Sequence, residues 1–179
     1  MTTTDRRDVL IAAAGLTALA ATRAESQTLT PAEPGQFAWL DGDWRIAHRR
    51  LKGPGDWDQF EGEATCWSIL DGRAHVEELR IPVRDFSGMG LRTLDPEAGV
   101  WLDYWMNAKV GKLGGEGVAG RFVNGDGVFD SEDRDDQGPM IVRGLWDQIT
   151  GTSHRWRQGI SRDGGTTWEW NWIMEWTKV

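Results

Sequence analysis

The chain has 179 residues, enough for one domain with additional segments. Its formal charge of −8 and its lack of a basic stripe argue against nucleic acid as a partner. Tryptophan dominates the aromatic residues, with 12 Trp against 5 Phe and 1 Tyr, and indole suits apolar surfaces that need one polar tip. The single cysteine, Cys66, excludes an internal disulfide.

The first 24 residues have the three-part layout of an export signal. Arg6-Arg7 precede an apolar run from Val9 to Ala21 that is too short to span a membrane, and we expect cleavage after Ala24. The segment Asp5 to Leu10 resembles a twin-arginine signal, although it has an acidic and a β-branched residue where that pattern has a hydroxyl and an aromatic one. This resemblance implies transport of a folded, often cofactor-loaded chain; an ordinary secretory signal is the alternative.

The rest of the chain predicts a tether followed by one all-β domain. Glu25 to Gln36 holds two prolines among small and polar residues, which indicates a flexible tether. Phe37 to Leu40 is expected to form one helical turn over the end of a barrel. From Asp41 onward, short strand-like runs alternate with turn signals and show no helical period. Residues 37–179 therefore predict an antiparallel barrel of about ten strands.

Turn signals separate the expected strands, the clearest being Asp71-Gly72 and Asn124-Gly125. The strands are expected at 43–51, 59–70, 73–81, 90–94, 100–107, 118–123, 128–130 and 140–147 and in the two arms of a hairpin over 153–179. Residues 133–139 are predicted to form an acidic loop.

The last strand carries a stripe of large side chains. Trp168, Trp170, Trp172, Met174 and Trp176 share one parity, and a period of two is typical of a strand with one buried face. The stripe indicates either core packing or, for some of these rings, the wall of a ligand cavity.

Several motifs are spread over residues 37–179: Phe37-x-Trp-Leu-x-Gly-x-Trp44, His48-Arg49-Arg50, Trp101 to Trp105, Gly120-Arg121-Phe122 and Ser161 to Met174. Together they resemble an uncharacterised bacterial family of lipocalin-like proteins. The resemblance implies a calycin-type barrel with Trp44 plugging its floor, and it brings no catalytic residues.

Two further resemblances are less informative about function. Nitrobindin-type haem barrels also open with Gly-x-Trp, but Arg45-Ile46-Ala47 stands here in place of their further glycines, so haem is not implied. Ser161 to Trp168 matches the Asp-box of sialidase-like propellers, in which Asp and Ser bond loop amides while Trp packs beneath. A propeller needs repeated blades, so one box predicts a stable turn and not a glycosidase.

The first strand offers polar candidates beside Trp44. If Trp44 points inward, His48 and Arg50 do so too, because the three share a face. An inward Arg needs a carboxylate or an anionic ligand as its partner. The alternative is a bent strand on which both side chains reach solvent at the rim.

The Asp71-Gly72 turn predicts a second polar face. It pairs Ser68 with His75 and Cys66 with Glu77, and cross-strand partners share a face. Such a set could support acid–base chemistry. A solvated outer face over an apolar inner one is the simpler interpretation and the preferred one.

We therefore expect an exported barrel, periplasmic or secreted, that binds a small apolar or aromatic molecule in a Trp-lined cavity. The candidate ligand-binding residues are Trp44, His48, Arg50, Trp105, Trp156, Gln158 and Trp172. A small lyase, isomerase or cyclase is the alternative, with His48, His75 and Glu77 as catalytic candidates, and a surface interaction module is a third possibility. No histidine pair has ligand spacing, so no metal site is predicted; cofactor, ligand and oligomeric state stay open.

Overall fold

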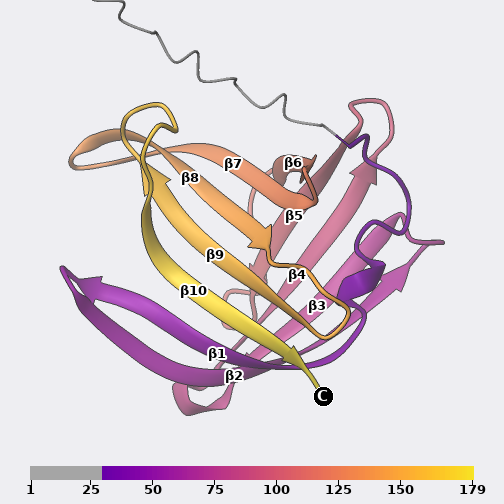
Figure 1. Ribbon diagram of the computed structural model, residues 1–179, viewed down its shortest axis with the longest axis horizontal. Coiled ribbons are helices and arrows are strands. Elements are labelled where there is room, and N and C mark those ends of the chain that lie inside the picture. Colours follow the sequence, from indigo (N-terminus) through magenta and orange to yellow (C-terminus); the bar gives the residue numbers. More distant parts are fainter. Residues whose placement is uncertain (1–29) are drawn as a thin grey trace, which may run out of the picture.

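The computed structural model describes residues 30–179, so the predicted export signal lies outside the described residues. Ten antiparallel strands form a closed barrel in which each strand pairs with its neighbours in sequence, and β1 closes the ring on β10 (Figure 1). The predicted all-β, lipocalin-like barrel of about ten strands is confirmed. No helix of the described residues has the length and hydropathy that a membrane span requires.

The strands are β1 (Gly42–Gly53), β2 (Asp56–Ile69), β3 (Ala74–Ile81), β4 (Phe86–Asp95), β5 (Val100–Asn107), β6 (Val118–Val123), β7 (Asp126–Asp135), β8 (Gly138–Asp147), β9 (Ser153–Ser161) and β10 (Glu169–Lys178). Two short 3₁₀ turns accompany them, η1 (Ala38–Leu40) and η2 (Pro82–Arg84).

The β2–β3 hairpin has the predicted register. Asp71 and Gly72 take positive φ angles of 53° and 77°, and the amide of Arg73 donates to the carbonyl of Leu70 at 3.1 Å. This tight turn pairs Ser68 with His75 and Cys66 with Glu77, as the sequence indicated.

The predicted acidic loop at 133–139 is mostly strand. Arg134 pairs with Pro139 and Asp135 with Gly138, so only two residues turn between β7 and β8. The hairpin tip projects from the barrel (Figure 1), and its charged side chains are exposed. With no buried face to satisfy, the tip lacks the apolar alternation from which strands are predicted.

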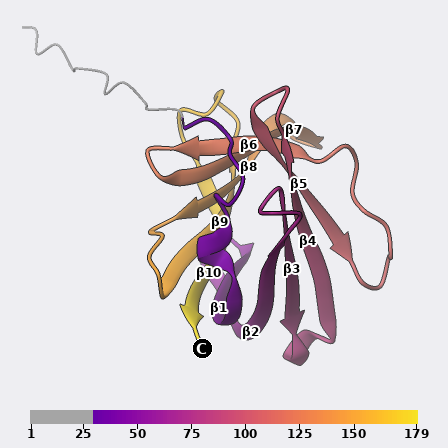
Figure 2. The ribbon, with the colours of Figure 1, turned by 90° about the vertical axis from the view of Figure 1, so that its right-hand side faces the viewer.

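The segment before the barrel is held on it. The amide of Thr30 donates to the carbonyl of Phe122 at 3.0 Å, and that of Gly35 to Gly72 at 2.9 Å. The indole of Trp101 donates to Oε1 of Gln36 at 2.8 Å. The predicted helical turn follows as η1, which lies in one opening of the barrel (Figure 2) and buries Leu40.

Large rings fill this end of the barrel. Phe37 packs edge-on against Trp101 at 5.0 Å, and Trp44 donates its indole N–H to the carbonyl of Leu40 at 2.7 Å. Trp146 and Trp176 complete the same core. Each of these rings is almost fully buried, so the end below the cavity is a packed core.

A β-bulge splits the predicted tryptophan stripe of β10. Trp170 pairs with Gly159 and Trp172 with Gln158, so Asn171 is an extra residue on β10. Trp172, Met174 and Trp176 face the barrel interior, whereas Trp170 lies on the outside under the guanidinium of Arg157, 3.9 Å from the ring centroid. The prediction that all the indoles share one face is wrong, because an unpaired residue reverses the alternation.

The preferred orientation of the β2–β3 hairpin is also wrong. Cys66, His75 and Glu77 are buried inside the barrel, while Trp67 is 42% exposed and Ile69 37% exposed on its outer face. The residues were correctly divided between the two faces of the hairpin, but the inner and outer faces were exchanged. The charged residues point inward because their partner, Arg92, is supplied by the next strand, β4.

The Asp-box segment forms the expected turn. Oδ1 of Asp163 accepts hydrogen bonds from the amides of Thr166 and Thr167 at 3.1 and 2.9 Å, and the Trp168 indole donates to the Gly165 carbonyl at 3.1 Å. Hydrogen bonds from Thr167 and Ser161 lower the pKa of Asp163 to about 2. The Ser161 hydroxyl and the Asp163 carboxylate are both used within the turn.

Candidate functional site

A cavity of about 270 Å³ lies inside the barrel, above the packed end. It is lined by Glu77, Leu79, Arg92, Asp103, Tyr104, Trp105, Trp146, Trp156, Gln158, Trp172, Met174 and Trp176. The charged residues come from β3, β4 and β5, whereas β8, β9 and β10 contribute indoles, a thioether and one amide. The cavity therefore has one charged wall and one apolar wall.

The pairing register of β2 to β5 determines which polar residues form the charged wall. Ser68, His75, Arg92 and Asp103 are successive cross-strand partners on β2, β3, β4 and β5. Cross-strand partners project to the same side of a sheet, so a row of four polar side chains faces the interior. Glu77 belongs to the adjacent row, two residues along β3.

Arg92 is the centre of this wall. Its side chain is 4% exposed, and Nη2 donates to Oε2 of Glu77 at 2.7 Å. Nε lies 3.4 Å from Oδ1 of Asp103, without the alignment of a hydrogen bond. The guanidinium also lies over Trp146, 4.8 Å from the ring centroid. One buried cation is thus shared by two carboxyl groups and an indole.

Asp103 is the less satisfied carboxyl group of the pair. Its side chain is 27% exposed, and its contact with Arg92 is longer than that of Glu77. Burial raises the pKa of Asp103 to about 6, in a balance to which the Arg92 charge contributes by lowering it and the nearby Glu77 carboxylate by raising it. A carboxyl group with a pKa near neutrality at a cavity wall is able to exchange protons with a ligand.

His75 lies behind the wall. Nη1 of Arg92 donates toward Nδ1 of His75 at 3.4 Å, which leaves the ring proton on Nε2, 3.3 Å from Oδ1 of Asp41. Burial and the Arg92 charge lower the pKa of His75 to about 3. The ring is fully buried and does not line the cavity, so it orients Arg92 as a neutral acceptor.

Aromatic rings form the opposite wall, and Trp105 adds one more beside Asp103 on β5. Trp156 meets Trp172 edge-on with centroids 5.8 Å apart. Trp105 lies over Gly88, where an added Cβ would stand 2.3 Å from the ring, so a residue without a side chain is required beneath it. The amide of Gln158 donates to Oδ1 of the bulged Asn171 at 3.1 Å, leaving the Gln158 carbonyl oxygen as an acceptor at the cavity.

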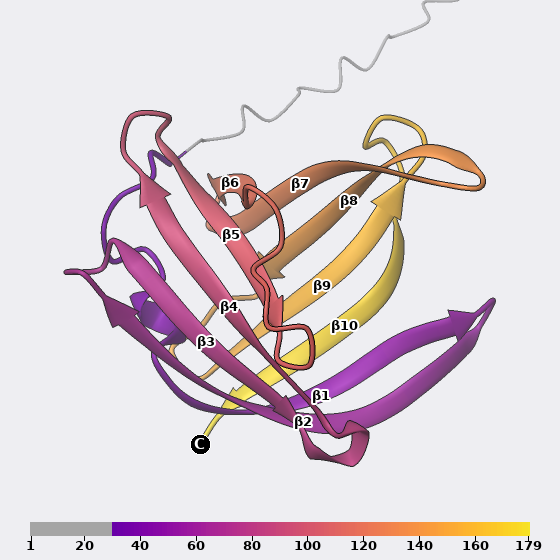
Figure 3. The ribbon, with the colours of Figure 1, turned by 180° about the vertical axis from the view of Figure 1, so that it is seen from behind.

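On the β6 side, the second half of β5 is flanked by a loop instead of by a strand. β5 pairs with β6 only from Trp101 to Asp103, and beyond that point the loop after β5 takes over, with Gly114 donating to the Trp105 carbonyl at 2.9 Å. Figure 3 shows this loop running beside the end of β5. The cavity residues Asp103 to Trp105 therefore lie where the barrel wall passes from strand to loop.

The predicted ligand-binding residues divide into two groups. Trp105, Trp156, Gln158 and Trp172 line the cavity. Trp44, His48 and Arg50 do not.

Each of the remaining three has a different position. Trp44 belongs to the packed floor, where the family resemblance placed it. His48 is buried in the wall, stacked on Phe60 at 4.7 Å, and its Nδ1 accepts from the Trp172 indole at 3.2 Å. Arg50 is exposed at the rim and lies over the outer side of Trp172, 4.8 Å from its centroid. Arg50 and Trp172 border a second hollow of about 200 Å³, so one indole separates the two spaces.

Arg92 and Asp103 are the charged lining residues that the sequence analysis did not name as candidates. Arg92 had the weaker signal. It lies on β4, where Gly88, Gly90 and Arg92 alternate with larger residues and look like an outward, weakly packed face. The usable signal was register, because the β3–β4 and β4–β5 turns place Arg92 between His75 and Asp103.

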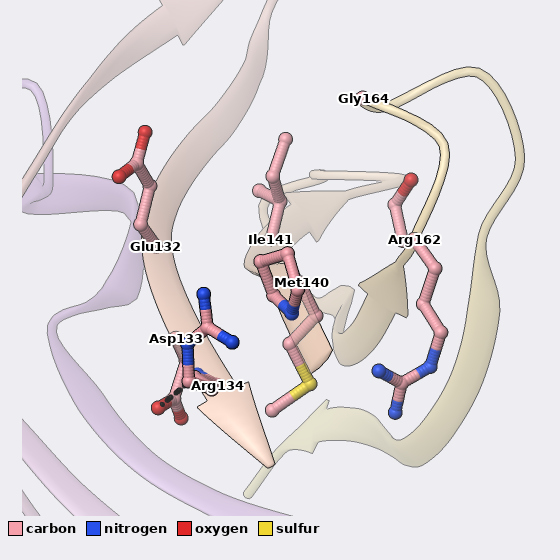
Figure 4. Close-up of a pocket in the computed structure, with 9 residues that line it drawn as sticks. Glu132, Asp133, Arg134, Met140, Ile141, Arg162 and Gly164 are labelled. Carbon is pink, nitrogen blue, oxygen red and sulfur yellow. Dashed lines mark hydrogen bonds between the residues drawn. The ribbon is translucent and has the colours of Figure 1, made fainter. Parts of the chain in front are cut away.

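A larger hollow of about 620 Å³ lies outside the barrel, between the β7–β8 tip and the Asp-box turn (Figure 4). Figure 4 shows Met140 and Ile141 between Glu132 on one side and Arg162 on the other. It is open, and Arg162 is already paired with Asp135 at 2.6 Å. Lacking both indoles and a buried charge, it is a weaker candidate than the internal cavity.

Among residues 30–179, no group of three or more His, Cys, Asp or Glu side chains is arranged to hold a metal ion. Comparison with models of known protein families gives no match, and neither does comparison with curated proteins. The argument for function therefore depends on the barrel and its cavity.

Proposed function

We propose that this protein is an exported barrel that binds a small, largely aromatic or apolar molecule in its internal cavity. The observation that carries this proposal is a space of about 270 Å³ with indoles on one wall and polar groups on the other. Ligand sites are typically concave and mostly apolar, with a few placed polar groups. Close-packed protein interiors leave few voids larger than a water molecule, so a space of this size is unusual for a core.

Export supports the same proposal. The arginine pair and apolar run of residues 1–24 have the layout of a signal, and a periplasmic or secreted barrel would meet its ligand outside the cytoplasm. Sequencing the N-terminus of the protein recovered from its host tests this part. A mature chain that begins at Glu25 supports export, and a chain that keeps Met1 contradicts it.

Native mass spectrometry of the protein purified from its own host tests the binding role. We expect an additional bound mass that is lost on denaturation. The variant Trp156→Ala removes one cavity wall and should lose that mass. Trp67→Ala removes an indole from the outer face and should retain it. A bare mass for the unmodified protein would count against a tightly held ligand, and equal retention by both variants would place the ligand elsewhere.

An acid–base reaction in the same cavity is the second candidate function, and one observation favours it. Asp103 lines the cavity and has a pKa of about 6, close to the pH at which a general acid or base works best. The histidine candidates are less favoured, because His48 and His75 are buried behind the lining. Glu77 lines the cavity but is held by Arg92.

Isotope exchange separates this candidate from simple binding. The bound molecule is recovered from protein held in deuterated water and is weighed. Deuterium at a carbon atom, absent with Asp103→Asn, would establish proton transfer. An unlabelled molecule would leave binding as the function.

A further inference from the structure

The cavity lining offers both acceptors and donors to a ligand, but the buried donors without a partner among the described residues are the neutral indole N–H groups of Trp146 and Trp176 and Nε of Arg92, which faces Asp103. The Gln158 amide nitrogen donates to Asn171, which leaves its carbonyl oxygen for the cavity. Nη1 and Nη2 of Arg92 are directed at His75 and Glu77. The Asp103 carboxyl group makes only the long contact with Arg92. A ligand that donates hydrogen bonds therefore meets a charged acceptor in Asp103, whereas one that accepts them meets the neutral indole N–H groups of the lining.

The charges of the lining residues have the same bias. Glu77, Arg92 and Asp103 are the charged groups that face one another there, from β3, β4 and β5. With both carboxyl groups ionised, the set carries one excess negative charge. The lining contributed by β8, β9 and β10 is uncharged: Trp146, Trp156, Gln158, Trp172, Met174 and Trp176. No lining cation other than Arg92 balances Asp103.

The indole wall favours a positive charge as well. The face of an indole attracts cations, and the effect grows where water is excluded. The barrel already uses it, since Arg92 lies over Trp146 and Arg50 over Trp172. Trp105, Trp156 and Trp176 line the cavity, and among the described residues no guanidinium lies over them. Trp105 is beside Asp103 on β5, and Trp156 and Trp176 face it from β9 and β10.

We propose that the cavity selects small organic cations, specifically amines with an aromatic or compact apolar body. The ammonium group lies against Asp103 and donates to it, while the body packs among the indoles of Trp105, Trp156 and Trp172. This inference rests on the proposed binding function and names the chemical class of its ligand.

The charge of Asp103 predicts how binding depends on pH. Arg92 and Glu77 are its only charged neighbours in the lining, and a cation supplies the balancing charge that it lacks. Above pH 6 Asp103 is mostly ionised and ready for an ammonium group; below pH 6 it takes up a proton and the attraction fades. Amine affinity should therefore fall as the pH drops through 6.

Three probes of equal size test the proposal by titration calorimetry on the mature barrel: 2-phenylethylamine, 2-phenylethanol and phenylacetate. At pH 7.5 we expect the amine to bind at least about tenfold more tightly than the alcohol, and the carboxylate most weakly. Asp103→Asn should reduce amine affinity about tenfold and change alcohol affinity much less, because the alcohol carries no charge. Glu97→Gln removes one carboxylate from an exposed turn and should change neither.

The outcomes separate the two proposals. Equal binding of amine and alcohol, or preference for phenylacetate, overturns cation selection and leaves a ligand-binding barrel in place. Amine preference that survives Asp103→Asn, in a variant whose melting curve shows that it is folded, also overturns it. Absence of binding by all three probes, together with a bare native mass, contradicts the binding function itself.

Discussion

Arg92 decides whether the charged wall is stable. Among residues 30–179 it is the only cation in contact with Glu77 and Asp103, and all three lie in the barrel interior. Removing one partner of a buried ion pair leaves an uncompensated charge, whereas replacing the whole set with neutral groups costs much less.

Arg92→Met should accordingly lower the free energy of unfolding by about 3–5 kcal/mol, measured by urea denaturation. The triple variant Arg92→Met, Glu77→Gln, Asp103→Asn should recover a large part of that loss. A single variant that loses less than about 1 kcal/mol would show that water already compensates these charges.

Trp44 has a different role, because it fills the floor and touches no cavity. It is 1% exposed and bonded to the Leu40 carbonyl. Trp44→Ala should cost about 3–5 kcal/mol of stability, as for other deletions of buried aromatic rings. Trp67→Ala, on the outer face, is the matched control and should cost under about 1 kcal/mol. Equal denaturation midpoints for the two variants would contradict the role of Trp44 as a plug.

At the scale of elements, the β10 bulge decides which indoles reach the cavity. Without Asn171, Trp170 and Trp172 would be adjacent on β10. The ordinary alternation of a strand would then still place Trp170 outside the barrel and Trp172 inside it. Deleting Asn171 should therefore preserve the barrel and both indole positions, and lose only the hydrogen bond to Gln158. Deleting Ile173 instead would turn Trp172 outward.

Ligand binding and near-ultraviolet circular dichroism distinguish the two deletions. The Asn171 deletion should keep the aromatic signal and weaken binding modestly, whereas the Ile173 deletion should lose both. If both deletions behave alike, the bulge does not set the orientation of the β10 indoles.

Elements also show what the sequence could and could not predict. Alternation and turn chemistry predicted β5 to the residue and the β2–β3 register, because both depend on local geometry. Which face of that hairpin points inward could not be predicted from it alone. The answer depends on Arg92, one strand further on, and a single hairpin does not contain that partner. The bulge was not predicted for a related reason. The alternation of Trp residues in the sequence continues through Asn171, although the register of backbone pairing shifts there.

For the molecule as a whole, buried histidines set the response to acid. Burial lowers the pKa of His48 to about 4, and burial together with the Arg92 charge lowers those of His75 and His154 to about 3. His154 is enclosed by indoles, with Trp44 and Trp176 at 4.5 and 4.8 Å, and neither ring nitrogen has a hydrogen-bond partner in the part of the chain that the structure describes.

These lowered histidine pKa values make the folded protein less stable as the pH falls. The unfolded chain binds protons below about pH 6.5, and the folded histidines stay neutral until about pH 4 to 3. Their contribution to stability is complete above pH 6.5 and is lost as the pH falls through that window, by at most about 1.4 kcal/mol per histidine and pH unit. Asp103 acts oppositely, since its protonation near pH 6 relieves a penalty in the folded state.

The three histidines outweigh Asp103 and Asp126, the carboxyl groups whose pKa is raised, so the urea midpoint should decrease steadily from pH 7 to pH 4.5. His154→Phe should make this decrease shallower, whereas Asp103→Asn should make it steeper. A midpoint that does not change over this range would contradict neutral burial of the histidines.

The ring closure between β1 and β10 also has a consequence for the order of events in folding. All other strand pairs join neighbours in sequence, but the contact of His48 with Trp172 joins residues 124 apart. Pairing of distant segments carries the largest loop entropy, so we expect hairpins to form first and the seam to close last. Since Trp172 belongs to the closing strand, a ligand meets a complete cavity only after that step. A bound ligand should therefore slow unfolding strongly while hardly changing the rate of folding.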